Sequence, residues 1–200
     1  LMKWDSSDKK NPNTLNERIN KAKIKGSSLI SRSYEPFGRR YVKEMIGHLL
    51  REDVQGMRDT YLEYRRIIEQ SDWEVEDFCK RESLKETFDE YLESVRIYEE
   101  HGQGAGGHTR FARFEVAMRD QKETGTEYLV GDAVEYYVAR PGNDQKNPGV
   151  ADLGKHAKNY EGDEMTSYYI DRLRRFTEKF RVFFTESDFR RLFNPEVSLF

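Results

Sequence analysis

Apolar side chains recur at helical spacing along most of this 200-residue chain, and the clearest case lies between residues 36 and 50. Phenylalanine, tyrosine, methionine and leucine side chains there share one face, whereas Arg39, Arg40 and Lys43 project from the other. Pro36 stands at the first position, where its fixed φ suits a helix and its missing N–H is not needed. The spacing therefore predicts a helix that begins at Pro36, with a cationic outer face.

Further segments repeat this pattern, and Asp53 is placed to cap the first of them. The spacing predicts additional helices over 54–68, 84–99, 111–122 and 163–184. The stripes of the first three predicted helices suggest one shared core. The apolar stripe of the helix predicted over 84–99 comprises Leu84, Phe88, Tyr91, Leu92 and Val95, and that of the helix predicted over 163–184 comprises Tyr169, Leu173, Phe176 and Phe180.

Alternating apolar and polar residues predict strands in two places. Residues 1–5 and 22–30 alternate on either side of a polar stretch, which indicates a two-stranded ribbon with a long loop. Such a ribbon is marginal alone, and the alternation at the first residue leads us to expect that the chain continues a larger protein. A second strand pattern over 128–139 is broken by a turn at Gly131 and Asp132. The expected fold is α+β and mostly α-helical, with an N-terminal ribbon and a small β hairpin.

The composition is that of a globular protein, with 36% hydrophobic, 36% charged and 13% aromatic residues. The single cysteine, Cys79, excludes an internal disulfide and is expected to be a small buried residue in a reducing compartment. No stretch is long and apolar enough to predict a membrane span, and no signal peptide is expected. These features predict a cytoplasmic protein without a membrane partner.

Charge is distributed unevenly, although the net formal charge is only −3. Residues 21–66 hold eleven Lys or Arg against six Asp or Glu, and residues 67–128 hold eight against sixteen. Because phosphate binding depends on local potential and not on the sum, contacts with nucleic acid should concentrate on the first segment.

No arrangement of residues predicts a catalytic centre. The glycine-rich stretch over 102–107 lacks a preceding strand and a following Lys-Ser/Thr, so it indicates a connector and not a phosphate-binding loop. The four histidines are scattered, without metal-ligand spacing, and the abundant carboxylates fit solvated helix faces. We expect no catalytic residue, no metal site and no cofactor in this chain.

Several motifs, in a fixed order, resemble the end of the palm and the thumb of bacterial-type family B DNA polymerases. The order of these motifs is KGSSLISRSYEPFGRR at 25–40, YLEYRR at 61–66, ESLKETFDEY at 82–91, EVAMR at 115–119, VGDAVEYYV at 130–138 and YYIDRL at 168–173. Glu82 stands where archaeal members tend to carry a basic residue, and Arg113 stands about where they have a histidine. The resemblance spans nearly all of residues 22–193.

The resemblance implies a non-catalytic module that grips primer-template duplex for a palm domain outside this chain. It implies the end of the palm over 1–33, a thumb domain over 34–193 and a tail over 194–200. The parent protein would be a DNA-directed DNA polymerase, a nucleotidyltransferase of replication or repair that uses Mg²⁺ and lies with the nucleoid. Grip on a duplex without base readout comes from cations, hydroxyls and helix N-termini on phosphates. The expected phosphate contacts are Arg32, Arg39, Arg40, Ser83, Lys85 and Thr87. The alternative for Arg32 is a structural pair with Glu35 that braces the palm against the thumb.

The last residues suggest a second partner. Leu199 and Phe200 resemble the Leu-Phe end of peptides that bind the bacterial sliding clamp, although Glu196 and Val197 replace the usual Gln and Leu. Packing of this tail on the thumb core is the alternative.

Two further classes of function compete with DNA binding. The chain could be a helical module that keeps the thumb fold but binds protein, in which case it has no salt-dependent affinity for duplex DNA. An unrecognised nuclease or other hydrolase would instead show metal-dependent turnover by the chain alone.

Overall fold

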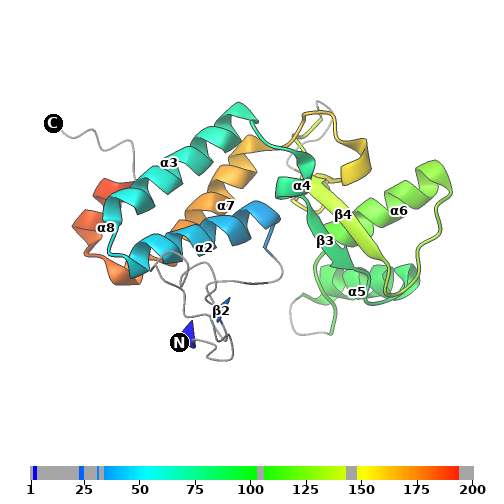
Figure 1. Ribbon diagram of the computed structural model, residues 1–200. Coiled ribbons are helices and arrows are strands. Elements are labelled where there is room, and N and C mark those ends of the chain that lie inside the picture. Colours follow the sequence, from blue (N-terminus) through cyan, green and yellow to red (C-terminus); the bar gives the residue numbers. More distant parts are fainter. Residues whose placement is uncertain are drawn as a thin grey trace, which may run out of the picture. The chain divides into compact units, whose positions relative to one another are not determined.

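The computed structural model describes residues 2–3, 23–24, 31, 34–102, 106–142 and 148–193, and Figure 1 shows their helices and strands. Across these ranges the protein is α+β and mostly helical, which confirms the predicted fold class. The helices are α2 (Pro36–Leu50), α3 (Val54–Gln70), α4 (Val75–Phe78), α5 (Phe88–His101), α6 (Ala112–Thr124), α7 (Thr166–Glu178) and α8 (Glu186–Phe193). Two 3₁₀ turns are η1 (Ala157–Asn159) and η2 (Arg181–Phe183). No helix in the described ranges could cross a membrane.

The chain forms two compact units. Unit 1 comprises Leu1–Asp72 and Ile170–Phe200, and unit 2 comprises Trp73–Tyr169. The division therefore falls within the range 34–193 for which we predicted a single thumb domain. In unit 1, β1 (Met2–Lys3) pairs with β2 (Lys23–Ile24) in antiparallel register, where the ribbon was expected.

The core of unit 1 is largely aromatic. Phe37 and Tyr41 of α2 and Phe176 of α7 are almost completely buried, and the rings of Phe37 and Phe176 meet edge to face at 5.8 Å. The Tyr41 hydroxyl lies 2.6 Å from the hydroxyl of Thr177 on α7, so its polar end is satisfied inside this core. The predicted stripe of α7 is confirmed, because Tyr169, Leu173, Phe176 and Phe180 are all at most 1% exposed.

The corner between α2 and α3 is held by His48. Its Nδ1 lies 2.7 Å from Asp53 Oδ2 and its Nε2 lies 3.1 Å from the Thr60 hydroxyl. Asp53 also caps α3, as predicted, by accepting a hydrogen bond from Gly56 N–H at 2.9 Å. A Cβ on Gly56 would lie 2.2 Å from both Asp53 Oδ2 and His48 Nδ1, so only glycine leaves room for this pair.

We predict that Gly56→Ala lowers the free energy of unfolding by about 2 kcal/mol, because the methyl group would displace the histidine or the capping carboxylate. Urea unfolding measures this loss. Gly142→Ala is the matched control, since a Cβ there meets nothing within 4 Å, and it should change stability by less than about 0.5 kcal/mol. Equal stability of the two variants would contradict the role given to Gly56.

Unit 2 is built on a three-stranded antiparallel sheet in the order β3 (Lys80–Ser83), β4 (Ala133–Val138), β5 (Gly154–His156). Ser83 pairs with Ala133 and Tyr136 pairs with His156. Helices α5 and α6 pack on it through a core that includes Tyr91, Phe114 and Val134. The rings of Tyr91 and Phe114 stack at 4.2 Å with 7° between their planes.

Several details differ from the sequence predictions. The helix expected over 84–99 begins at Phe88, because Leu84 continues the strand and Thr87 caps α5 in a capping box with Glu90. This helix does not share a core with α2 and α3, since it packs in unit 2. Leu92 is 51% exposed, so its place in the buried stripe was wrong.

The segment beyond α7 also differs. The helix expected over 163–184 ends at Glu178, and η2 and α8 follow it. Cys79 is half-buried where full burial was expected, and burial is the main cause that raises the pKa of its thiol to about 11. Such a thiol is protonated at neutral pH and is a poor nucleophile.

Tyrosine–carboxylate pairs run through unit 2. Each hydroxyl donates to a carboxylate at 2.6 to 2.9 Å, and the pairs are Tyr91–Glu115, Tyr128–Asp120, Tyr136–Glu82, Tyr137–Asp163 and Tyr160–Glu164. Two of the carboxylates also bind lysine, with Lys158 at 2.6 Å from Asp120 and Lys155 at 2.6 Å from Asp163. The acidic residues of this unit therefore serve its packing as well as its surface.

We predict that these pairs make the protein sensitive to acid. Burial raises the pKa of Asp120, but Lys158 and Tyr128 outweigh it and hold the pKa below its usual value in the folded state. A folded-state pKa below the unfolded one gives stability that is full above the unfolded value, near 3.8, and is lost as the pH falls through the folded value. Urea unfolding at pH 6 down to pH 3 should show this loss.

Asp120→Asn should flatten that pH dependence, because the variant lacks the titrating group. Glu127→Gln, at an exposed position, should leave it unchanged. Parallel pH profiles for wild type and Asp120→Asn would exclude the Asp120 contribution.

Candidate nucleic-acid interface

The two units carry opposite charge. Unit 1 has 22 Lys and Arg against 16 Asp and Glu, a formal charge of +6, and unit 2 has 12 against 21, a charge of −9. The division of the fold thus coincides with the division of charge noticed in the sequence. A polyanion is attracted to unit 1 and repelled by most of unit 2.

The outer face of α2 carries the strongest candidates. Arg39, Arg40 and Lys43 are all exposed, whereas the opposite face of this helix is buried. Among the described residues, no carboxylate pairs with Arg39 or Lys43, which lie one helical turn apart. Arg40 lies beside the Tyr64 hydroxyl, where its charge opposes the rise in the pKa of that tyrosine that burial and Glu44 cause. Arg39 and Lys43 are therefore the α2 cations most available to a phosphate.

A buried ion pair fixes the start of α2. The Glu35 carboxylate is 1% exposed and accepts hydrogen bonds from Arg172 Nη2 at 2.9 Å and Nε at 3.2 Å. Arg172 also lies over the Phe176 ring, 4.9 Å from its centroid. A carboxylate at a helix N-terminus and a bidentate arginine are both favourable, and together they tie α2 to α7. The alternative pair of Glu35 with Arg32 stays a prediction, because Arg32 lies outside the described residues.

The other predicted contacts lie in unit 2, on the segment that joins β3 to α5. Side chains alternate here: Ser83, Lys85 and Thr87 face solvent, while the residues between them face the fold. Of the two carboxylates on the inner side, Glu82 accepts from the Tyr136 hydroxyl at 2.8 Å and Glu86 lies 3.0 Å from His108 Nε2. The alternation thus leaves one ammonium group and two hydroxyl-bearing residues on the outside.

Thr87 is less available than its exposure indicates. Its hydroxyl donates to Glu90 Oε2 at 2.9 Å and accepts from Glu90 N–H at 3.3 Å, and Glu90 Oε2 also accepts from Thr87 N–H at 2.8 Å. Asp89 and Glu90 occupy the first turn of α5. The carboxylates of α5 therefore already occupy the N-terminus of this helix, where its dipole would attract an anion.

Arg113 stands about where archaeal members of the resembled family have a histidine, and in unit 2 it is a packing residue. Its guanidinium lies over the ring of Phe111 at 4.4 Å and 3.6 Å from Glu82, with a side chain only 15% exposed. These contacts direct its charge into the unit and away from a ligand at the surface.

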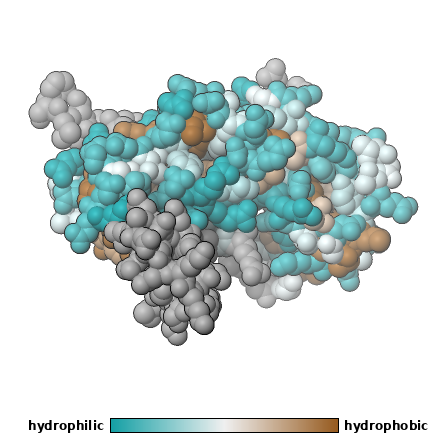
Figure 2. All heavy atoms as spheres, in the orientation of Figure 1, coloured by the Kyte–Doolittle hydropathy of each residue, from teal (hydrophilic) through white to brown (hydrophobic). Residues whose placement is uncertain are grey.

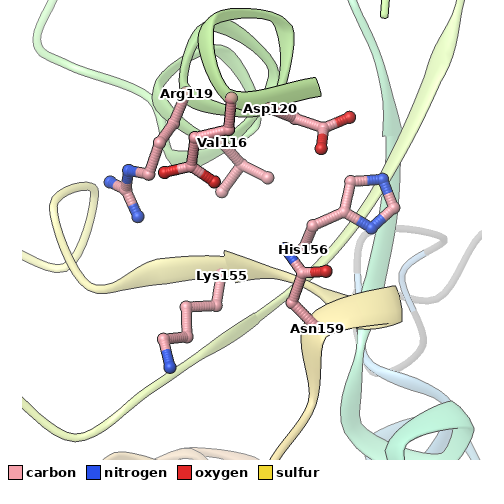
Figure 3. Close-up of a pocket in the computed structure, with 7 residues that line it drawn as sticks. Val116, Arg119, Asp120, Lys155, His156 and Asn159 are labelled. Atoms are coloured by element: carbon pink, nitrogen blue, oxygen red, sulfur yellow. The ribbon is translucent and has the colours of Figure 1, made fainter.

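The charged pocket between α6, β5 and η1 offers little chemistry. It encloses about 110 Å³, enough for a few water molecules. Figure 3 shows Arg119 and Asp120 projecting from α6 above His156 and Asn159, with Lys155 extending away. Arg119 donates to Gly154 O at 3.0 Å, and burial and Lys158 lower the pKa of His156. Within the described ranges, no three His, Cys, Asp or Glu side chains are arranged to hold a metal ion.

Three predicted contacts lie outside the described residues: Arg32, Leu199 and Phe200. The clamp-binding tail therefore stays a prediction. The structure adds Lys43, which the sequence placed on the outer face of α2 but not among the site residues. The signal for it was present, because Lys43 follows Arg39 by four residues on the same cationic face.

Neither a scan against the models of known protein families nor a search of curated proteins returned a match to this chain.

Proposed function

We propose that this chain is a non-catalytic thumb fragment of a family B DNA-directed DNA polymerase and that it holds primer-template duplex through phosphate contacts. The observation that carries the proposal is the outer face of α2, where Arg39 and Lys43 stand exposed without a carboxylate partner among the described residues. Other exposed arginines of the described part of unit 1 are neutralised by a neighbouring glutamate or aspartate, as Arg181, Arg190 and Arg191 are. Exposed cations without a carboxylate partner are the groups that neutralise the phosphates of a DNA backbone.

The motif order supports this assignment in a second way. The KGSSLISRSYEPFGRR stretch that resembles the family's palm-to-thumb segment ends in Arg39 and Arg40, on the exposed face of α2. The ESLKETFDEY stretch contributes Lys85, which is exposed and has no ion-pair partner in the described part of the chain. Because unit 2 carries −9, we assign Lys85 a smaller contribution than the two cations of unit 1.

We predict that the chain binds duplex DNA with an affinity that falls steeply as salt rises, since bound cations displace counterions from the phosphates. Arg39→Ala/Lys43→Ala should reduce the slope of log K against log salt by roughly two and weaken binding at low salt. Fluorescence anisotropy with a primer-template duplex measures both quantities. Two duplexes of different sequence should bind alike, because phosphate contacts carry no sequence information.

Arg175→Ala/Arg190→Ala is the matched control. It removes the same number of charges from exposed helix positions of unit 1, but both arginines are paired, with Asp171 at 2.8 Å and Glu186 at 2.7 Å. We expect a much smaller change in slope. No binding at low salt, or equal losses in the two double variants, would exclude the α2 face as the DNA site and favour a protein-binding module instead.

A further inference from the structure

Unit 2 carries an exposed apolar patch, in contrast to the cationic face of α2 in unit 1. Leu92, Leu129 and Val130 are 51%, 70% and 54% exposed. Leu129 and Val130 follow Tyr128, whose ring lies 6.5 Å from that of Phe88, and Leu92 stands one helical turn beyond Phe88 on α5. Figure 2 shows apolar surface over the end of unit 2 where β3 ends and β4 begins. We call these three residues the aliphatic patch.

The turn that presents the patch is rigid. Asp132 N–H donates to Leu129 O at 3.1 Å, and Leu129 N–H donates to Asp132 Oδ2 at 2.8 Å. Gly131 takes a φ of +101°, which the third position of such a turn requires. Two hydrogen bonds then tie the turn to the strand, from Gly131 N–H to Leu84 O at 2.8 Å and from Leu84 N–H to Asp132 O at 2.9 Å. Two large aliphatic side chains are thus held in water by a fixed backbone, with little ordering left to do on binding.

The surroundings of the patch are acidic. Helix α5 holds five Asp or Glu against one Arg, and Asp89 of this helix is exposed one turn before Leu92. Glu93 is exposed as well, but it already pairs with Arg96 at 2.6 Å. Glu127 is exposed next to the turn, and Lys85 is the cation on the neighbouring segment. The whole unit carries −9, so it repels a phosphate backbone and attracts a cationic surface.

We infer that the aliphatic patch is a docking site for a basic protein segment that carries an apolar side chain. The apolar side chain packs on Leu92, Leu129 and Val130, and lysines or arginines of the partner face Asp89 and Glu127. Apolar centres with a charged rim are the usual arrangement of protein interfaces, and the rim sets orientation and rate of association. This site is separate from the proposed DNA contacts of α2, and its existence does not depend on them.

The experiment uses the full chain and three probes. The first is a synthetic peptide of alternating lysines and leucines, the second has serine in place of every leucine, and the third is a duplex DNA. Binding is followed through the methyl resonances of Leu92, Leu129 and Val130. The Lys/Leu peptide should bind and shift these methyl signals, and its affinity should fall about tenfold or more in Leu129→Ser/Val130→Ser. The Lys/Ser peptide should bind weakly and equally to both proteins, through charge alone.

Two controls separate the patch from general stickiness and from the charge of the unit. Val182→Ser removes a side chain that is 82% exposed in unit 1, and it should leave peptide affinity unchanged. Glu127→Gln should weaken binding of the Lys/Leu peptide and make that binding less sensitive to salt. Equal affinity of the Lys/Leu peptide for wild type and Leu129→Ser/Val130→Ser would overturn the inference. Shifts of the three methyl signals with duplex DNA and not with the peptide would also overturn it, because the patch would then belong to the DNA interface.

Discussion

Burying tyrosine is the constraint on which this structure depends. The chain has 12 tyrosines and 12 phenylalanines, and Tyr41, Tyr61, Tyr91, Tyr137 and Tyr169 are among its largest fully buried side chains. A phenol in the core must find an acceptor, because an unpaired buried hydroxyl loses its hydrogen bonds to water without replacement. In unit 1 Thr177 provides such a partner for Tyr41, whereas in unit 2 the acceptors are mostly carboxylates.

That choice of acceptor contributes to the acidity of unit 2. Each carboxylate that receives a phenol must sit close to the core, and two of them, Asp120 and Asp163, are also neutralised by Lys158 and Lys155. The remaining acidic residues occupy helix starts and outer faces, as Asp89 and Glu90 do on α5. A unit assembled in this way accumulates negative charge from its packing, and it is therefore a poor surface for phosphates and a good one for cationic protein segments.

Unit 1 solves the same packing problem with fewer carboxylates. Arg172 forms an ion pair with Glu35 that is buried against Phe176. Other arginines form ion pairs with acidic residues on the same helix, as Arg66 does with Glu63. Among the described residues Arg39 and Lys43 have no carboxylate partner, and Glu44 of α2 accepts a hydrogen bond from the Tyr64 hydroxyl at 3.0 Å. The outer face of α2 therefore keeps its positive charge.

How much the sequence could predict follows from these same residues. The spacing of apolar residues and the identity of the capping residues were enough to predict α2, the Asp53 cap and the buried stripe of α7, because neighbouring residues decide these features. The same local chemistry was present in Thr87 and Glu90, whose spacing marks the start of α5, but the apolar run from Leu84 concealed it.

What the sequence could not give depends on distant pairings. Leu84 lies outside α5 because Asp132 and Gly131 bind its backbone from more than forty positions away, and the partner of Glu35 stands 137 residues along the chain. No window of a dozen residues contains either contact. Residue type nevertheless constrained the outcome, since a carboxylate before Pro36 required a cation, and YYIDRL at 168–173 contained one. For the candidate sites the same limit applies: the cations of α2 could be found by spacing, whereas the aliphatic patch exists only once β3, α5 and the turn at Gly131 have met.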